Sequence, residues 1–87
     1  MSKTDKLIAK IENYRNGNSI TFSDLEQYLS IFEIKKQGMH GSHAKFSHPS
    51  FLRPFIVPVH GSTVKIAYVR KAIELVQALK DKEEGGN

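Results

Sequence analysis

The chain has 87 residues, 39% hydrophobic and 25% charged, with a formal net charge of +4 and no cysteine. The length predicts one domain of modest stability, because so short a chain buries only about 60–65% of its unfolded surface. The basic charge favours an anionic partner such as nucleic acid or an acidic protein, although an ordinary, slightly basic soluble protein fits it equally well. The lack of cysteine excludes disulfides and thiolate metal sites.

The first predicted element is an amphipathic helix over residues 3–15. Its apolar residues recur at helical spacing between lysines and acids: Leu7, Ile8, Ile11 and Tyr14. We interpret it as an added packing element, with an interaction surface as the alternative. Its apolar run is too short for a signal peptide or a membrane span, so we expect a cytoplasmic protein with no membrane partner.

A second helix is predicted to begin at Thr21, where Thr21 and Asp24 form a capping-box pattern. Its apolar stripe consists of Phe22, Leu25, Leu29 and Phe32. The last helix is predicted over 65–81 and is followed by a flexible tail at 82–87, which is polar and rich in glycine. The stripe of this last helix consists of Val69, Ala72, Ile73, Val76 and Leu79.

Alternating patterns predict three short strands between these helices. The first holds Phe32 and Ile34 inward and Lys35 outward, and the glycine-rich residues 38–41 read as a hairpin connection. The third strand covers 55–59. The order of elements indicates an α+β fold, in which a three-stranded antiparallel sheet has its helices on one face. We expect a single core that includes Phe22, Leu25, Leu29, Phe46, Val57, Ile73 and Val76.

The second strand follows a glycine-led turn and carries the most reactive group of side chains. The stretch Gly41-Ser42-His43-Ala44-Lys45-Phe46 places a hydroxyl, an imidazole and an ammonium within four residues. Side chains alternate between the faces of a strand, so His43 and Lys45 share one face while Phe46 takes the other. Phe46 is the expected core anchor. His43 and Lys45 are therefore predicted to face outward, where they suit a phosphate-bearing partner.

This motif, followed by His48-Pro49 and later by Pro58-Val59-His60, resembles the HicA toxins of bacterial toxin–antitoxin pairs. The similarity covers roughly Thr21 to Leu79, and it implies a HicA-like core over 21–81. It also implies an αβββα, double-stranded-RNA-binding-like sandwich, to which the helix at 3–15 is an addition. The implied activity is cleavage of mRNA, and the implied partner is a HicB-type antitoxin that covers the face around the motif histidine.

The resemblance places the catalytic histidine of these toxins at His43. RNA is cleaved when a base removes the proton of a 2′-hydroxyl, which then attacks the adjacent phosphate, and histidine suits this task near neutral pH. Lys45 and Lys35 are predicted to bind phosphate, with backbone donors from Gly41 and Ser42. Without the resemblance, His43 reads as an ordinary surface histidine and the lysines as a solvated face.

The other histidines are given lesser roles. His40 is placed in the hairpin turn, His48 on the face opposite His43, and His60 in a structural or supporting position. A metal site is not expected, because His43 and His48 differ in strand parity and neither cysteine nor a nearby acid completes a ligand set. We expect no cofactor. The alternatives to a metal-independent endoribonuclease are a non-catalytic RNA-binding module and a protein-binding domain.

Overall fold

The structure, a computed structural model, describes residues 2–16, 19–59 and 61–85. Within these ranges the chain forms a three-stranded antiparallel sheet, three α-helices and one short 3-10 helix, so the predicted α+β class is confirmed. In chain order the elements are α1 (Lys3–Glu12), the 3-10 helix (Tyr14–Asn16), α2 (Phe22–Ile31), β1 (Lys35–His40), β2 (His43–Ser47), β3 (Phe55–Pro58) and α3 (Ile66–Gly85). In the described ranges, none of the helices has the length and apolar character needed to cross a bilayer.

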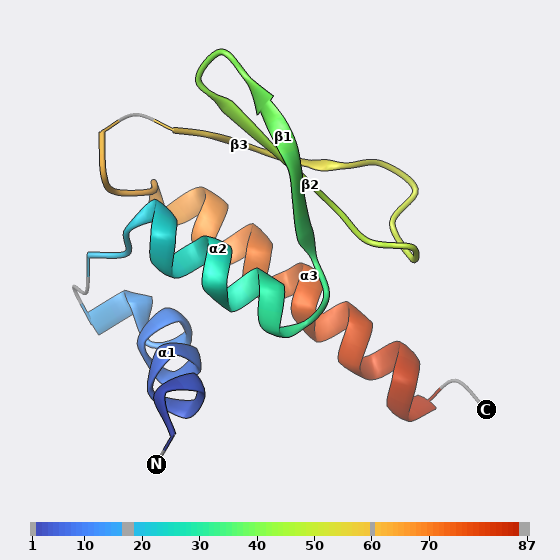
Figure 1. Ribbon diagram of the computed structural model, residues 1–87. Coiled ribbons are helices and arrows are strands. Elements are labelled where there is room, and N and C mark those ends of the chain that lie inside the picture. Colours follow the sequence, from blue (N-terminus) through green and yellow to red (C-terminus); the bar gives the residue numbers. More distant parts are fainter. Residues whose placement is uncertain (1, 17–18, 60, 86–87) are drawn as a thin grey trace.

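The strands follow one another in the order β1-β2-β3, so β2 is the central strand. Figure 1 shows α2 and α3 lying together on one side of this sheet, with α1 packed beyond them. Ala44, Phe46 and Val57 are fully buried against these helices. The Phe46 ring lies 6.0 Å from that of Phe22, centroid to centroid. The core therefore fills the space between one face of the sheet and the helices.

Most of the predicted core residues are buried. Leu25, Leu29, Phe46, Val57 and Val76 are at most 1% exposed. Phe22 and Ile73 are half-buried and pack against the margin of the same cluster. The core also takes in Ile11 from α1 and Tyr14 from the 3-10 helix, so the N-terminal segment contributes to the same hydrophobic cluster as the sheet.

The capping box at the start of α2 is confirmed. The hydroxyl of Thr21 accepts a hydrogen bond from the Asp24 backbone N–H at 3.0 Å, and the Asp24 carboxylate accepts one from the Thr21 N–H at 3.4 Å. The ammonium of Lys10 in α1 lies 2.8 Å from the same carboxylate. The hydrogen bond from Lys10 is the main reason why the pKa of Asp24 is lowered, and the hydrogen bonds with Thr21 lower it further.

The predicted start of the first strand at Phe32 is wrong. Phe32 is the C-cap of α2, and Glu33 takes a left-handed backbone conformation with φ of 64°. The Ile34 N–H donates to the Leu29 carbonyl at 3.0 Å and the Glu33 N–H to the Ser30 carbonyl at 3.1 Å, which is the Schellman pattern of helix termination. Ile34 is fully buried, as predicted, but it closes the helix rather than opening a strand.

The predicted connection over 38–41 is also wrong, because β1 continues to His40. Gly38 pairs with Lys45 inside the sheet, next to a bulge between Lys36 and Gly38. Since His40 pairs with His43, the connection consists of Gly41 and Ser42 alone. Gly41 has φ of 61°, as the first central residue of a type II′ turn requires.

Both ends of the chain differ in detail from the prediction. The helix expected over 3–15 ends at Glu12, and a 3-10 helix follows it. Tyr14 in that 3-10 helix accepts a hydrogen bond from the Arg70 guanidinium of α3 at 3.4 Å. At the other end α3 continues to Gly85, through residues predicted to belong to the tail. The last two residues of that predicted tail lie outside the described residues.

Candidate nucleic-acid interface

The side chains of β2 alternate as predicted. Ala44 and Phe46 are fully buried, His43 is exposed, and Lys45 is partly exposed on the same side as His43. Because Phe46 anchors the strand from within the core, its neighbours must point away from the helices. The structure therefore places the imidazole and the ammonium of the motif on the face of the central strand that the helices leave uncovered.

Strand pairing extends this surface across the sheet. Residues that pair directly share a face, so the partners of His43, Lys45 and Ser47 point the same way. We call this surface the open face, and it consists of Lys35, Gly38 and His40 from β1, His43, Lys45 and Ser47 from β2, and Ile56 and Pro58 from β3. The three strands that form it contain no acidic residue. Their charges are thus positive or, for the histidines, neutral to positive.

Lys45 lies in the middle row of the open face, between Gly38 and Ile56. Glycine leaves the β1 side of this row without a side chain, and Ile56 is 41% exposed on the β3 side. No ion pair holds the Lys45 ammonium within the described part of the chain. Lys45 is consequently accessible to an anionic ligand.

Lys35 lies at the opposite end of the open face from His43. It pairs with Ser47, four residues along β2 from His43, which corresponds to about 13 Å of strand. Its ammonium lies 3.5 Å from the Glu33 carboxylate, and both side chains are more than 60% exposed. Such an exposed pair contributes little energy and opens easily. Lys35 therefore belongs to the same face as His43 but does not lie beside it.

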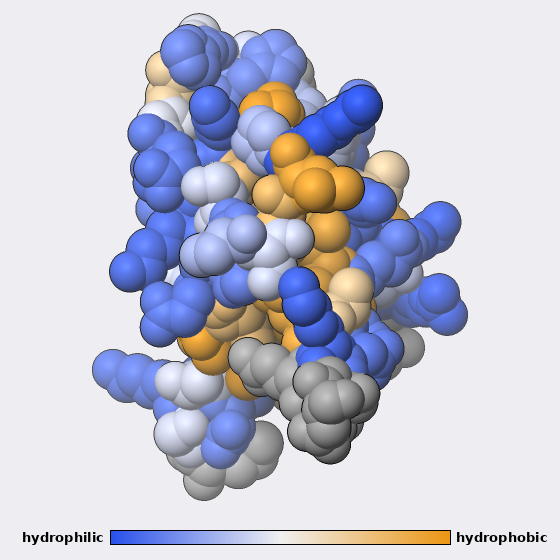
Figure 2. All heavy atoms as spheres, turned by 90° about the vertical axis from the view of Figure 1, so that its right-hand side faces the viewer, coloured by the Kyte–Doolittle hydropathy of each residue, from blue (hydrophilic) through white to orange (hydrophobic). Residues whose placement is uncertain are grey.

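Two further cations near the sheet, Lys36 and Arg53, lie away from this face. Lys36 turns toward α2, where its ammonium lies 3.5 Å from Glu26 and over the Phe22 ring. Arg53 lines a hollow of about 580 Å³ between the β2–β3 loop and α3, together with Lys71 and apolar side chains such as that of the fully exposed Leu52. Figure 2 looks onto the side of the molecule with this loop and shows a band of hydrophobic residues there.

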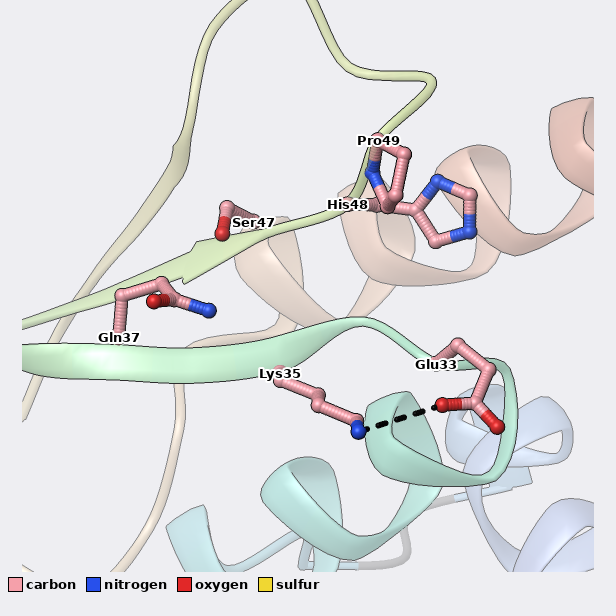
Figure 3. A pocket seen from close by; sticks show the side chains of 6 residues that line it. All are labelled: Glu33, Lys35, Gln37, Ser47, His48 and Pro49. Carbon is pink, nitrogen blue, oxygen red and sulfur yellow. Dashed lines mark ion pairs between the residues drawn. The ribbon is translucent and has the colours of Figure 1, made fainter.

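A hollow of about 670 Å³ lies at the Lys35 end of the open face. Figure 3 shows its lining, which consists of Glu33, Lys35, Gln37, Ser47, His48 and Pro49. Of the predicted site residues it includes Lys35 alone. The histidine in this hollow, His48, is held in place, since its Nδ1 accepts a hydrogen bond from the Ser50 N–H at 3.0 Å and its ring packs against Phe51.

Gly41 and Ser42 are exposed and lie directly beside His43 in the hairpin turn. The Ser42 carbonyl accepts a hydrogen bond from the Val59 N–H at 2.6 Å, which ties the turn to the end of β3. The turn is thus a fixed part of the sheet. Its backbone lies next to the exposed imidazole, as the predicted role of these two residues requires.

One residue that the sequence prediction placed elsewhere belongs to this surface. His40 was expected in the turn, but it is the last residue of β1, exposed on the open face directly opposite His43. The signal was the spacing: two histidines flanking Gly-Ser fit a two-residue hairpin turn, whose flanking residues pair. His60, to which a supporting role was assigned, lies outside the described residues.

The described residues contain no group of three or more side chains suited to bind a metal ion. No protein-family model matches the chain, and searches of curated proteins and of solved structures give no match. The resemblance to HicA toxins therefore rests on the motif residues of the sequence.

Proposed function

We propose that this protein is an endoribonuclease that cleaves mRNA on the open face without a metal ion, with His43 as the base. One observation carries the proposal: the exposed His43 and the partly exposed Lys45 lie on the same, uncovered face of the central strand, which the buried Phe46 anchors. The resemblance to HicA toxins supports the choice of mRNA and a place of action in the cytoplasm. It also supports a double-stranded-RNA-binding-like arrangement of α2, the sheet and α3.

The proposed reaction is an internal attack within the RNA. The neutral His43 imidazole takes the proton of a 2′-hydroxyl, and the oxygen attacks the adjacent phosphorus. Lys45 lies two residues along the strand, about 6.6 Å away at the backbone, which leaves room for a phosphate between the two side chains. Its ammonium then stabilises the negative charge that develops on the phosphate oxygens. Gly41 and Ser42 border the phosphate, and Lys35 binds the RNA farther along the open face.

The test compares the wild-type protein with His43→Ala on RNA in the presence of a metal chelator. We expect cleavage by the wild type and a loss of at least about 10²-fold in rate for the variant, the usual contribution of general base catalysis. Because His43 is exposed, the melting temperature should hardly change. The products should carry a 2′,3′-cyclic phosphate and a 5′-hydroxyl. His48→Ala, which removes an imidazole from outside the open face, is the matched control. Full activity of His43→Ala, or strict dependence on a metal ion, would falsify the mechanism.

The second candidate is a non-catalytic RNA-binding module. It is favoured by one feature: among the described residues, no carboxylate forms an ion pair with the His43 imidazole. In this case the wild type binds RNA but yields no product at any pH. His43→Ala would then change only the dissociation constant for RNA. The same cleavage assay therefore separates the two functions.

We also propose that a HicB-type antitoxin covers the open face around His43 and Lys45. Such a protein would compete with RNA for Lys45 and shield the imidazole from substrate. Proton transfer by His43 plays no part in this contact. His43→Ala should therefore still bind the antitoxin in a titration, and the complex should no longer bind RNA. A complex that leaves RNA binding intact would rule out this form of inhibition.

A further inference from the structure

The two histidines of the β1–β2 hairpin form a pair on the open face. His40 and His43 flank the Gly41-Ser42 turn and are direct partners in the sheet. Residues that flank a two-residue turn exchange backbone hydrogen bonds, which places their Cα atoms about 5.5 Å apart. Their Cβ atoms point to the same side at a separation of about 4.5–5.5 Å. Both are exposed, and neither imidazole has a hydrogen-bond partner within the described part of the chain.

The surroundings of this pair leave both imidazoles available for proton transfer. In the described part of the molecule, the pair is bordered by Gly41 and Ser42 in the turn and by the uncharged Pro58 on β3. The nearest cation on the open face is Lys45, one row along β2, whereas Lys35 lies at the far end. The strands contribute no carboxylate that would hold either imidazole in its charged form. Both rings are therefore open to a substrate that approaches the open face.

We propose that His40 is the general acid of the cleavage reaction and works together with His43 as the base. This inference rests on the proposed function. His43 accepts the proton of the 2′-hydroxyl while the new bond forms between that oxygen and phosphorus. The bond from phosphorus to the 5′-oxygen breaks, and the protonated His40 donates a proton to that leaving oxygen. The step yields a 2′,3′-cyclic phosphate and a 5′-hydroxyl, and proton exchange with water restores both imidazoles.

The geometry suits this division of labour. The attacking and leaving oxygens lie on opposite sides of the phosphorus in an in-line displacement, so base and acid must approach from two sides. The imidazoles of His40 and His43 come from neighbouring strands, with Cβ atoms about 4.5–5.5 Å apart, so a phosphate can bind between the two rings. Lys45 remains in the adjacent row, where it contacts the oxygens that take no part in bond making or breaking. The turn holds the two strands in fixed register, which fixes the spacing of the pair.

The pH dependence of kcat/KM is the first readout. An enzyme that needs a neutral base and a protonated acid has a bell-shaped profile, with an acidic limb from the base and an alkaline limb from the acid. We expect His40→Ala to lose the alkaline limb and to slow cleavage by about 10²–10⁴-fold. His40→Gln retains a hydrogen-bonding side chain without a titrating proton, and it should show the same loss. Gln37→Ala, an exposed change in the same strand, is the matched control and should follow the wild type.

The second readout changes the leaving group. In an RNA whose scissile 5′-oxygen is replaced by sulfur, the leaving group is a thiolate, which departs without being protonated. Cleavage of this RNA therefore needs a base but no acid. We expect His40→Ala to cleave this substrate nearly as fast as the wild type, while His43→Ala remains slow on it. Affinity for a 2′-O-methyl RNA, which cannot react, should be within about twofold of the wild-type value in His40→Ala. A role of His40 in folding or binding alone would not produce this selective rescue.

The outcomes separate this inference from the proposed function. If the wild type cleaves neither ordinary RNA nor the sulfur-substituted RNA, both the proposed function and the role of His40 are overturned. If the wild type cleaves and His43→Ala is inactive, but His40→Ala cleaves ordinary RNA at the wild-type rate with an unchanged alkaline limb, only the role of His40 is overturned. A slow His40→Ala that is not rescued by the sulfur leaving group also overturns that role.

Discussion

Glu33 occupies a backbone position at which most side chains are strained. Its φ of 64° lies in the left-handed region, which costs L-amino acids roughly 1–2 kcal/mol and favours glycine at the end of a Schellman motif. The side chain offers little compensation, because its ion pair with Lys35 is long and exposed. We expect Glu33→Gly to raise the free energy of unfolding by about 0.5–1 kcal/mol. The gain is smaller than the strain that is relieved, because glycine also increases the entropy of the unfolded chain. Denaturant titration measures this change.

Two further variants isolate the cause of that gain. Glu33→Ala removes the carboxylate but keeps the strain, so it should bring no increase in stability. Lys35→Gly places glycine two residues later, in the extended β1 strand, where it should destabilise by about 0.5–1 kcal/mol. If Glu33→Ala stabilises the protein as much as Glu33→Gly does, charge at this position is responsible rather than backbone conformation.

At the scale of the element, α1 is linked to the start of α2 through one carboxylate. The Asp24 carboxylate contacts the Lys10 ammonium at 2.8 Å and accepts a hydrogen bond from the Thr21 backbone N–H, and these contacts lower its pKa. A carboxyl whose pKa is lower in the folded than in the unfolded state stabilises the fold above the unfolded value of about 3.9. That stability is lost as the pH falls through the lowered folded value.

We therefore expect Asp24→Asn to cost about 1 kcal/mol near neutral pH and progressively less below about pH 4, as the wild type loses the same interactions. Free energies of unfolding measured from pH 7 down to pH 2 provide the comparison. Glu26→Gln in the same helix is the control, and it should cost less because its ion pair with Lys36 is longer, at 3.5 Å. A difference between Asp24→Asn and the wild type that does not change with pH would contradict this account.

The sequence predicts the helices and strands more reliably than the residues at which they begin and end. Phe46 and Leu25 are buried as predicted, because amphipathic periodicity reports which face meets the core. The end of α2 at Phe32 was missed because its termination depends on Glu33, a residue type that rarely takes the left-handed conformation. Gly38 suggested a turn but lies beside a bulge inside the sheet, and both uses of glycine look alike in sequence.

The candidate site was predictable in part. The outward position of His43 and Lys45 followed from strand parity once Phe46 was assigned to the core. The position of His40 did not follow, because it depends on the exact length of the turn, and a change of one residue would move it to the other face. The spacing of His40 and His43 around Gly41 and Ser42 is compatible with a two-residue turn, but only the pairing between the strands shows that this register is adopted.

At the scale of the whole molecule, a net charge of +4 favours any polyanion, whereas under the proposed function the lysines of the open face set the number of phosphates bound. Binding of single-stranded RNA releases counterions, so the logarithm of the association constant falls with the logarithm of salt concentration at about −0.7 per phosphate neutralised. Lys35 and Lys45 are the lysines of the open face, which predicts a slope of about −1.4. The measurement uses a 2′-O-methyl RNA, which binds without being cleaved, at a fixed pH of 8.

A pair of variants with equal net charge tests whether the open face is the interface. Lys45→Ala and Lys71→Ala each remove one positive charge, but Lys71 lies on α3 beside the hollow under the β2–β3 loop. If RNA binds the open face, Lys45→Ala reduces the steepness of the salt dependence by about 0.7, and Lys71→Ala leaves it as in the wild type. Net charge acting at long range would weaken binding equally in both variants. A larger effect of Lys71→Ala would place the RNA on the helical side of the molecule, away from His43.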